Sequence, residues 1–365
     1  MYGPIPARRS LAAAGLVAAL VASAGTWAWA ESAGPWPVSG KLYGEPDRHR
    51  PEDAAASEKA DDVSGIACAT GSGFPRVCLV ADDESQGAQI VVLDDGGLRA
   101  GSFIRLVDAA HAGEPLELDA EGVAFADGAF YVVGSHGRPR HAAGKPEAGT
   151  VARAEATRHL FRIRFDPAAV DPETGVLAGR PEIADTRALA RLIREDPVLK
   201  PFHDRPLEEG GVTIEGVAVR DGVLHAGFRG PVLQGEAAVV LSVPLPGLFE
   251  GAPGTPRVTR LPLGRDSSGA ARGIRDLVAV PEGFLILAGP MLDPKDGAVA
   301  AGDYAIFRWN GTEAPLQALA LDGYGRKVKP EALLPLDRTA EGLRALVLFD
   351  GPKEGAPRTI AIPLR

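Results

Sequence analysis

The sequence of 365 residues predicts an all-β fold, and three observations support this prediction. A hairpin motif, in which an apolar strand, a glycine-rich turn and a second strand follow one another, occurs five times. The 45 glycines and 31 prolines suit many turns, and few residues are aromatic. The five copies begin at Ser64, Glu121, Glu215, Arg275 and Glu331. A unit repeated at this length is typical of a β-propeller.

Each copy continues into further predicted strands, so that each repeat supplies one blade. Third strands are expected at residues 88–93, 159–165, 237–244, 304–309 and 359–364, and fourth strands at 102–107, 181–185, 257–263 and 316–321. The last repeat lacks a fourth strand, which residues 38–43 are expected to supply by pairing with residues 359–364. The prediction is five four-stranded blades. Six blades are the alternative, if the long second repeat contains a degenerate blade.

The repeats differ in length because some carry insertions. Successive copies begin 57, 94, 60 and 56 residues apart. The second repeat has insertions at about residues 137–158 and 186–211, and the fourth has one at about 291–303. Residues 186–195 have a helical composition, with Asp185 or Thr186 as the candidate N-cap. The arginine-rich segment 137–158 is either a solvated loop or a lid. All three insertions are expected on one face, where long loops commonly carry binding residues.

The first thirty residues are predicted to be a signal peptide. Arg8 and Arg9 precede an apolar stretch at residues 11–25, and Ala28-Trp29-Ala30 forms a cleavage motif. The apolar stretch is short for a membrane span, and a retained N-terminal anchor is the alternative. Residues 31–365 are then a single propeller domain, periplasmic or secreted, with no membrane span after cleavage.

The charge of the chain restricts its partners. The formal net charge is −9, and it becomes −11 without Arg8 and Arg9 of the predicted signal peptide. An acidic chain lacks the basic face that sequence-independent nucleic-acid binding requires, so no nucleic-acid partner is expected. We expect a monomer that binds a small anionic ligand through a local group of arginines.

The two cysteines, Cys68 and Cys78, lie symmetrically about the turn at residues 71–73. In a hairpin of that register they are directly opposite each other, and an oxidising compartment permits a disulfide. Two free buried thiols are the alternative. The disulfide would be structural, since no histidine neighbours the pair.

The repeat also predicts which side chains meet at one mouth of the central channel, because each inner strand starts there and its partner returns there. The expected neighbours are Ser64 with Asp82, Glu121 with His136, Glu215 with Arg229, Arg275 with Gly289, and Glu331 with Phe349 or Asp350. Two like charges 5 Å apart repel by about 3 kcal/mol at an effective dielectric constant of 20. The carboxylates therefore require a cation or raised pKa values.

Two interpretations of this group remain open. In one, a divalent cation, for which Ca²⁺ is favoured, is bound by Glu121, Glu215 and Glu331. In the other, the glutamates are neutralised in a salt-bridge network by Arg229, Arg275 and Lys329.

The arginines have two interpretations as well. Arg229 and Arg275 lie among glycines, where the backbone approaches a ligand closely, and guanidinium groups match phosphate or carboxylate. Alternatively, each pairs with a glutamate of an adjacent blade. In a hydrolase His136 would transfer protons, and Asp276 completes the candidate catalytic residues. Ser135 and His136 are adjacent in an extended segment, so they are not expected to form a nucleophilic pair.

Six motifs in order resemble a bacterial family. They are Glu121-Gly-Val-Ala, Gly134-Ser-His136, Glu215-Gly-Val-Ala, Gly227-Phe-Arg-Gly-Pro231, Gly273-Ile-Arg-Asp276 and Pro330-Glu331. From about Val63 to the C-terminus the chain is similar to the family called domain of unknown function 3616, which implies no particular activity. The Glu-Gly motif is also similar to that of secreted phytase-like esterases. A more distant similarity is to lactonase propellers, where such a glutamate binds a divalent metal; their Asn and Asp ligands have no clear match here.

Taken together, the residues and the resemblance predict a metal-dependent hydrolase of an anionic ester, with a phosphoester favoured over a lactone. The three glutamates would hold a metal that activates water, and Arg229 and Arg275 would bind the anion. The alternative is a non-catalytic propeller of the cell envelope that binds a ligand or a protein.

Overall fold

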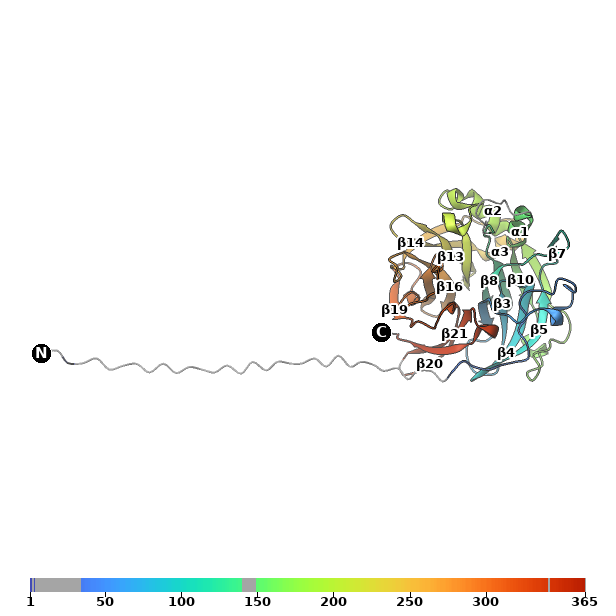
Figure 1. The fold of residues 1–365 in the computed structure, drawn as a ribbon, viewed down its shortest axis with the longest axis horizontal. Helices are drawn as coiled ribbons and strands as arrows, with labels where there is room; N and C mark the ends of the chain where they lie inside the picture. The colour runs from blue at the N-terminus through green and yellow to red at the C-terminus, as the bar shows by residue number, and fades with distance from the viewer. Residues whose placement is uncertain (2, 4–33, 140–148, 341, 365) are drawn as a thin grey trace. The chain divides into compact units, whose positions relative to one another are not determined.

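Five β-sheets follow one another along the chain, and their innermost strands contact one another around a ring (Figure 1). The computed structural model describes residues 1, 3, 34–139, 149–340 and 342–364. The predicted signal peptide lies outside the described residues, apart from positions 1 and 3. The predicted five-bladed propeller is confirmed, and the six-bladed alternative is wrong because the second repeat forms one sheet.

The strands of each blade run from the channel outward. The first blade contains β2 (Val63–Cys68), β3 (Arg76–Asp82), β4 (Gly87–Asp94), β5 (Gly97–Arg105) and, at its outer edge, β1 (Val38–Ser39). The second contains β8 (Ala120–Ala126), β9 (Ala129–Gly134), β10 (Leu160–Arg164) and β11 (Glu182–Thr186). The third contains β12 (Thr213–Arg220), β13 (Val223–Leu233), β14 (Ala237–Pro244) and β15 (Arg257–Pro262).

The last two blades follow the same order. The fourth contains β16 (Arg272–Val280), β17 (Gly283–Pro290), β18 (Ala305–Trp309) and β19 (Leu316–Ala320). The fifth contains β20 (Lys329–Arg338), β21 (Leu343–Asp350) and β22 (Arg358–Ile362). A small separate hairpin is formed by β6 (Ala110–His111) and β7 (Glu114–Pro115).

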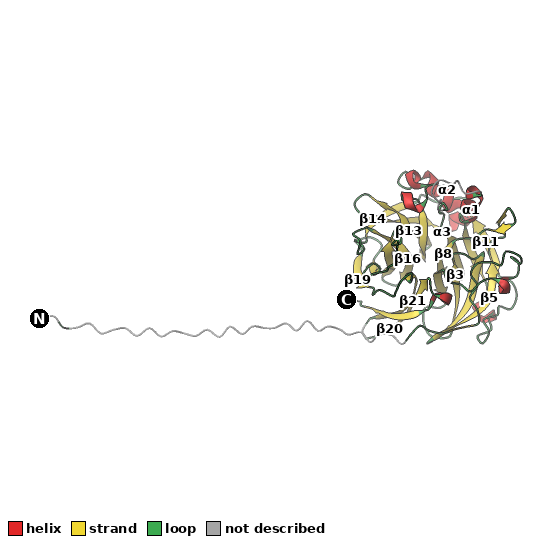
Figure 2. Cartoon of the chain, in the orientation of Figure 1, coloured by secondary structure: helices red, strands yellow, loops and turns green. Residues whose placement is uncertain are grey.

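The helices are short and lie in the connections between strands (Figure 2). The α-helices are α1 (Thr150–Ala156), α2 (Ala188–Glu195) and α3 (Leu245–Glu250). Single turns of 3-10 helix occur at Ala54–Ala56, Pro167–Ala169, Lys200–Phe202, Leu207–Glu209 and Lys353–Gly355. The helix predicted in the second insertion is α2. Its N-cap position is Arg187, while the Thr186 hydroxyl accepts a hydrogen bond from the Ala188 N–H at 3.1 Å.

The ring closes differently from the prediction. Residues 38–43 do not pair with residues 359–364; instead Val38 and Ser39 pair in parallel with Leu98 and Arg99 at the outer edge of the first blade. Near β22, the N–H of Trp36, just before this segment, donates to the Pro357 carbonyl at 2.7 Å. The prediction therefore failed because the outer edge of blade one takes this strand.

Side-chain contacts seal the boundary between the fifth and first blades. Leu42 is 1% exposed and belongs to the apolar cluster between these blades. The guanidinium group of Arg76 donates to the carbonyl oxygens of Pro335 at 3.1 Å and Leu336 at 2.6 Å. Packing, these side-chain hydrogen bonds and main-chain bonds such as that from the Gly351 N–H to the Asp61 carbonyl at 2.7 Å join the two ends of the ring without a shared four-stranded sheet.

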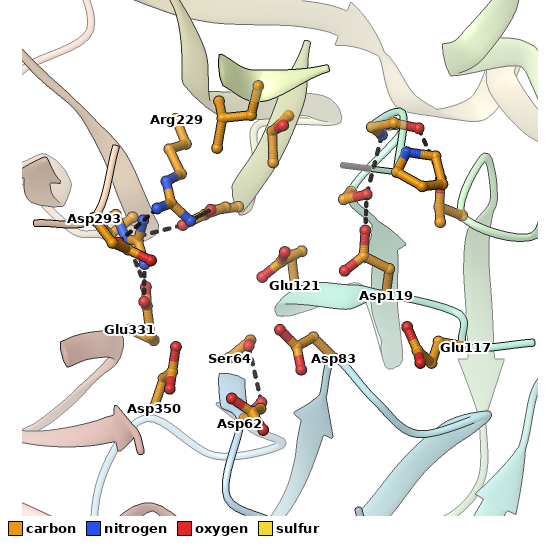
Figure 3. A pocket seen from close by; sticks show the side chains of 18 of the residues that line it. Asp62, Ser64, Asp83, Glu117, Asp119, Glu121, Arg229, Asp293, Glu331 and Asp350 are labelled. Carbon is orange, nitrogen blue, oxygen red and sulfur yellow. Dashed lines mark hydrogen bonds and ion pairs between the residues drawn. The ribbon is translucent and has the colours of Figure 1, made fainter. Parts of the chain in front are cut away.

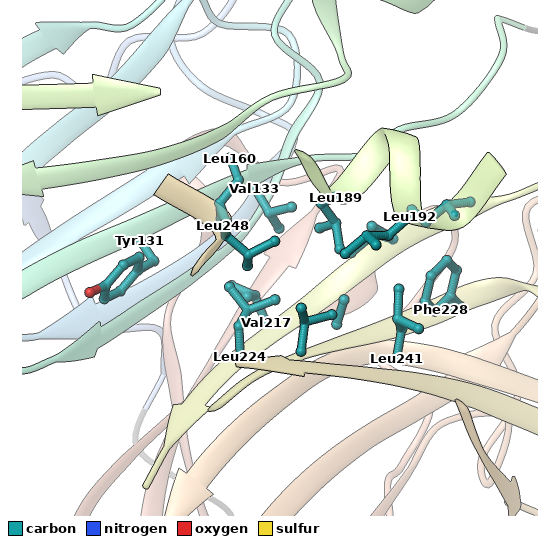
Figure 4. Close-up of a cluster of buried hydrophobic side chains, with 14 of the residues drawn as sticks. Tyr131, Val133, Leu160, Leu189, Leu192, Val217, Leu224, Phe228, Leu241 and Leu248 are labelled. Carbon is teal, nitrogen blue, oxygen red and sulfur yellow. The ribbon is translucent and has the colours of Figure 1, made fainter. Parts of the chain in front are cut away.

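Each boundary between neighbouring blades contains one of five hydrophobic clusters. The largest lies between the second and third blades and is covered by α2, which contributes Leu189 and Leu192 (Figure 4). Val133 and Leu160 enter it from blade two and Leu241 from blade three. Alternating strand residues face these clusters, as expected for sheets packed face to face.

The repeated glycine that follows the first residue of three copies allows the inner strands to approach one another closely. A Cβ atom on Gly122 would lie 3.0 Å from the Val217 nitrogen, and one on Gly216 would lie 2.5 Å from the Leu277 nitrogen. Both contacts are with main-chain atoms of the next blade, which would have to shift to admit a side chain. The glycine of the Glu-Gly motif is thus required by the packing of the ring.

Among the described residues, none of the helices has the length and apolar character needed to cross a membrane.

The structure links Cys68 and Cys78 by a disulfide between β2 and β3, where the two residues are register partners. The bridge closes a loop with a sequence separation of 10 residues. Removing both thiols by a double substitution to serine is expected to lower the free energy of unfolding by no more than about 2–3 kcal/mol, because the loop is short. Urea denaturation checks the value. Complete alkylation of both cysteines without a reductant would contradict the bridge.

Candidate functional site

The first residue of each repeat is placed in the same way by a local irregularity. In all five hairpins the register between the two innermost strands shifts at that residue: Ser64, Glu121, Glu215, Arg275 and Glu331 are each skipped in the pairing. A β-bulge turns a side chain out of the regular alternation, which is a common device beside functional sites. The bulges direct all five side chains into one cavity.

This cavity at the mouth of the channel has a volume of about 390 Å³ (Figure 3). The described residues lining it include nine acids and five bases. All three sequence insertions reach it, through Arg138 and Arg153 from the first, Leu207 from the second and Asp293 from the third. These four residues lie on one face of the propeller, as predicted for the three insertions.

One side of the cavity is a buried salt-bridge network. Glu215 lies 3.0 Å from Arg229 Nη1 and 3.0 Å from Arg275 Nε. Arg275 Nε also donates to Glu331 at 2.7 Å, so this guanidinium group joins two of the predicted metal ligands. Arg229 Nη2 donates to Asp293 at 2.7 Å. These distances correspond to the network interpretation for Glu215 and Glu331.

The network extends to the fifth blade through Lys329. Its ammonium group lies 3.4 Å from Asp293 and forms an ion pair with Asp350. Four acids and three bases therefore follow one another without interruption in the order Glu331, Arg275, Glu215, Arg229, Asp293, Lys329 and Asp350.

The other side of the cavity holds a group of three carboxylates outside this network. Glu121 is 9% exposed, lines the cavity and has no side-chain hydrogen bond or ion pair among the described residues (Figure 3). Asp83 Oδ1 is buried and lacks a hydrogen-bond partner. One carboxylate oxygen from each of Asp83, Asp119 and Glu121 lies within 4.8 Å of the others. We call these three residues the acidic cluster.

The sequence-based metal set is therefore corrected. Glu121, Glu215 and Glu331 line one cavity, but the described residues show no close grouping of these three carboxylates. Glu215 and Glu331 are held by arginines, whereas Glu121 has two aspartates as neighbours. Asp119 is in turn fixed by the Ser135 hydroxyl, which donates to it. Within the cavity, the carboxylates grouped closely enough to hold a cation are those of the acidic cluster; Asp61, Asp62 and Glu84 form a second such group, of which Asp62 lines the cavity.

Burial controls the protonation of this side of the cavity. It raises the pKa of Glu121 well above its usual value, and repulsion from Glu215 and Asp119 adds to the effect. Burial likewise raises the pKa of Asp83, with repulsion from Glu121 as the next cause. Glu117, which lines the cavity beside Asp119, has its pKa raised to about 7, again chiefly by burial. A bound cation would reverse these shifts by stabilising the ionised carboxylates.

We expect the metal-free protein to lose stability as the pH rises from 6.5 to 8. The pKa values of Asp62, Glu84 and Glu117 are raised to about 7, and that of Asp276 to about 8, mainly by burial. In this window the folded state holds protons that the unfolded chain has released, so the free energy of unfolding falls as the pH rises.

The pH range distinguishes the effect of these carboxyl groups on stability from that of the buried histidines. Burial lowers the pKa of His136 and His225 to about 4, so their contribution to stability rises with pH up to about 6.5 and is then constant. Thermal unfolding in a chelator at pH 6.5, 7 and 8 tests the fall, and saturating Ca²⁺ should reduce it. A melting temperature that increases across this range would contradict it.

Three of the sequence-predicted site residues do not face the cavity. His136 is 3% exposed, and its Nδ1 atom lies 2.8 Å from the Gly134 carbonyl oxygen, which keeps the ring in the interior. Asp276 accepts hydrogen bonds from the Leu277 and Leu333 N–H groups, both at 2.7 Å, and so joins the fourth and fifth blades. Asp82 is 4% exposed and accepts a bond from the Asp62 N–H at 3.3 Å. The expected roles of His136 and Asp276 in catalysis have no geometric support.

Other predicted neighbours have mixed outcomes. Arg229 and Asp350 line the cavity, as the repeat suggested, but both are engaged in the network. Phe349 is fully buried in the cluster between blades four and five. The predicted arginine clamp for an anion is therefore filled by the protein's own carboxylates. Arg140, His141 and Lys145, three basic residues of the first insertion, lie outside the described residues.

Sequence reasoning missed Asp83, Glu117 and Asp119. A usable signal existed for two of them, because Glu117, Asp119 and Glu121 alternate as the residues of one strand face do. Asp83 follows β3 directly, one position beyond the residue expected to face the mouth. The bulge at the first position of each repeat explains the shift by one residue.

The chain matches one protein family over most of its length. Residues 74–359 match the family described as "Protein of unknown function (DUF3616)", and the chain belongs to that family. No curated protein sequence matches it significantly.

Several solved structures are similar in fold. An exo-β-1,3-galactanase from Phanerochaete chrysosporium has 10% identity and a TM-score of 0.43, and the match covers 91% of this chain and 64% of that one. An α-L-arabinofuranosidase from Podospora anserina has 11% identity and a TM-score of 0.42, with 89% and 95% covered. Regucalcin from Agrobacterium tumefaciens, described as a calcium-binding protein, has 13% identity and a TM-score of 0.36, with 91% and 96% covered. No functional inference follows from similarity at this level.

Proposed function

We propose that this member of the family is an exported, divalent-cation-dependent hydrolase that acts on a small anionic ester at the mouth of the propeller. The observation that supports the proposal is the acidic cluster, in which Glu121 is buried beside Asp83 and Asp119 without a counter-charge of its own among the described residues. Like charges brought together in a buried site are stabilised by a cation.

The residues fit a hard cation. Carboxylate oxygens within 4.8 Å of one another match the spacing of ligands that share a Ca²⁺, whose bonds to oxygen are about 2.3–2.6 Å long. Asp83, Asp119 and Glu121 would hold the ion, and the ion would supply an acidified water molecule and charge stabilisation. No histidine is among the described residues that line the cavity, which favours Ca²⁺ over a transition metal.

Glu117 has the properties of a general acid or base in this reaction. It lines the same cavity, and burial raises its pKa to about 7, so it both accepts and releases protons near neutral pH. It takes the role that the sequence suggested for His136. A phosphoester remains the favoured substrate, because phosphate oxygens bind both a divalent cation and guanidinium groups.

Two measurements on purified residues 31–365 test the proposal. The first is Ca²⁺ binding by calorimetry together with elemental analysis. The second is hydrolysis of chromogenic phosphate, carboxylate-ester and lactone substrates in Ca²⁺ and in a chelator. We expect one bound cation and hydrolysis of the phosphate ester that the chelator abolishes. Absence of cation binding, or equal hydrolysis with and without the chelator, would refute it.

One observation favours a second candidate, a propeller that binds a ligand without converting it. Arg229, Arg275 and Lys329 are all occupied by carboxylates, so they cannot stabilise a developing negative charge without rearrangement. In that case the substrate panel would be negative while Ca²⁺ still binds.

A further inference from the structure

Three of the five bases that line the cavity are already paired with carboxylates of the protein and are not available to a ligand. Arg229, Arg275 and Lys329 share four carboxylates in the salt-bridge network. With acids in excess, this part of the cavity is already more than neutralised. An anionic substrate must therefore find its positive partners elsewhere.

The remaining two bases, Arg138 and Arg153, are in a different condition. Both line the cavity from the insertion of blade two, Arg138 shortly after β9 and Arg153 on α1. Arg138 Nη1 donates to the main-chain carbonyl of Asp204 at 2.8 Å, an uncharged acceptor. The Nε atoms of both arginines are buried without a hydrogen-bond partner. Neither forms an ion pair with a carboxylate among the described residues.

Arg153 lies near the acidic cluster, in the cavity that Arg138 also lines. The positive charge of Arg153 lowers the pKa of Glu117, in opposition to the larger effects of burial and of Asp119. Asp119 belongs to the acidic cluster, so Arg153 and the proposed cation flank the same part of the cavity. This arrangement offers two kinds of positive charge to one ligand.

We propose that Arg138 and Arg153 form the subsite for the oxyanion of the substrate, a phosphate or a carboxylate group. The inference rests on the proposed function, in which the cation occupies the acidic cluster and faces the same ligand. Guanidinium groups donate paired hydrogen bonds to the oxygens of such anions. Because the lining acids outnumber the bases nine to five, the anion binds only after the cation has offset part of the negative charge.

The test compares anion and cation binding in the same variants of residues 31–365. The probes are phenyl phosphate and benzoate, titrated by calorimetry at saturating Ca²⁺, and Ca²⁺ alone. In the double variant Arg138→Gln/Arg153→Gln we expect anion binding to weaken at least about tenfold. Calcium binding should be unchanged or tighter, because two positive charges leave the cavity. Arg194→Gln, on the exposed surface of α2 and outside the cavity, should change neither.

The outcomes separate this inference from the proposed function. Wild-type protein that binds Ca²⁺ but neither anion, or a double variant that binds both anions as the wild type does, would overturn the subsite. A double variant that loses Ca²⁺ binding together with the anion would also overturn it, since a merely structural role explains that result. If the wild type binds an anion without Ca²⁺ and the double variant does not, the subsite stands and the cation proposal fails. Binding of phenyl phosphate but not benzoate identifies the oxyanion as phosphate.

Discussion

Replacing Glu215 with glutamine is expected to lower the free energy of unfolding by about 3 kcal/mol. Glu215 is 2% exposed and forms ion pairs with Arg229 and Arg275, each 3.0 Å away. The variant keeps the shape of the side chain but removes the shared negative charge. Each arginine retains one carboxylate, Asp293 or Glu331, so the loss is smaller than for a fully isolated buried charge.

The metal dependence of this loss distinguishes the two interpretations that the sequence left open. If Glu215 belongs to the network, urea denaturation gives the same loss in Ca²⁺ and in a chelator. Glu282→Gln is the matched control: Glu282 pairs with Arg338 on the surface, its side chain is 62% exposed, and its loss should cost less than about 1 kcal/mol. If the Glu215→Gln variant is destabilised only when Ca²⁺ is present, Glu215 is a metal ligand and the network interpretation is wrong for it.

The sequence predicted the ring and its five equivalent positions because both follow from a local repeat. A hairpin that begins at an equivalent position in every copy places its first residue at the same height in every blade, whatever the insertions between copies. The strand boundaries followed within a few residues for the same reason. The pairing of residues 38–43 could not be predicted in this way, because the segment could join the outer edge of either the fifth or the first blade, and the repeat does not say which.

The candidate site was predicted in part. Ser64, Glu121, Glu215, Arg275 and Glu331 do share a cavity, but the repeat carries no information about pairing within it. Glu215 and Glu331 met arginines because the fourth repeat begins with Arg275 between them around the ring. Glu121 has no arginine neighbour of this kind, and its partners Asp83 and Asp119 come from segments outside the repeated motif. Contacts between non-equivalent segments are set by the fold rather than by the repeat.

Replacing Glu121 with glutamine is expected to act in the opposite direction to the change at Glu215. In the metal-free protein at pH 7 the variant should be more stable by about 1 kcal/mol, because a carboxyl whose pKa is raised by burial and by Glu215 is replaced by a neutral group. At pH 4, where the carboxyl is largely protonated whether the chain is folded or unfolded, the gain should disappear. Urea denaturation in a chelator at the two pH values measures this difference.

In the presence of Ca²⁺, the Glu121→Gln variant should lose the stabilisation that bound Ca²⁺ gives to the wild type. Glu121 is the buried member of the acidic cluster without a partner of its own among the described residues, so its charge contributes directly to cation binding. We expect Ca²⁺ affinity to fall at least about tenfold, equivalent to about 1.4 kcal/mol, and Ca²⁺-dependent hydrolysis to be lost. Glu215→Gln provides the comparison, since it should weaken folding with little change in the stabilisation that Ca²⁺ adds. Equal Ca²⁺ affinity in the wild type and in Glu121→Gln would show that the cation, if bound, lies outside the acidic cluster.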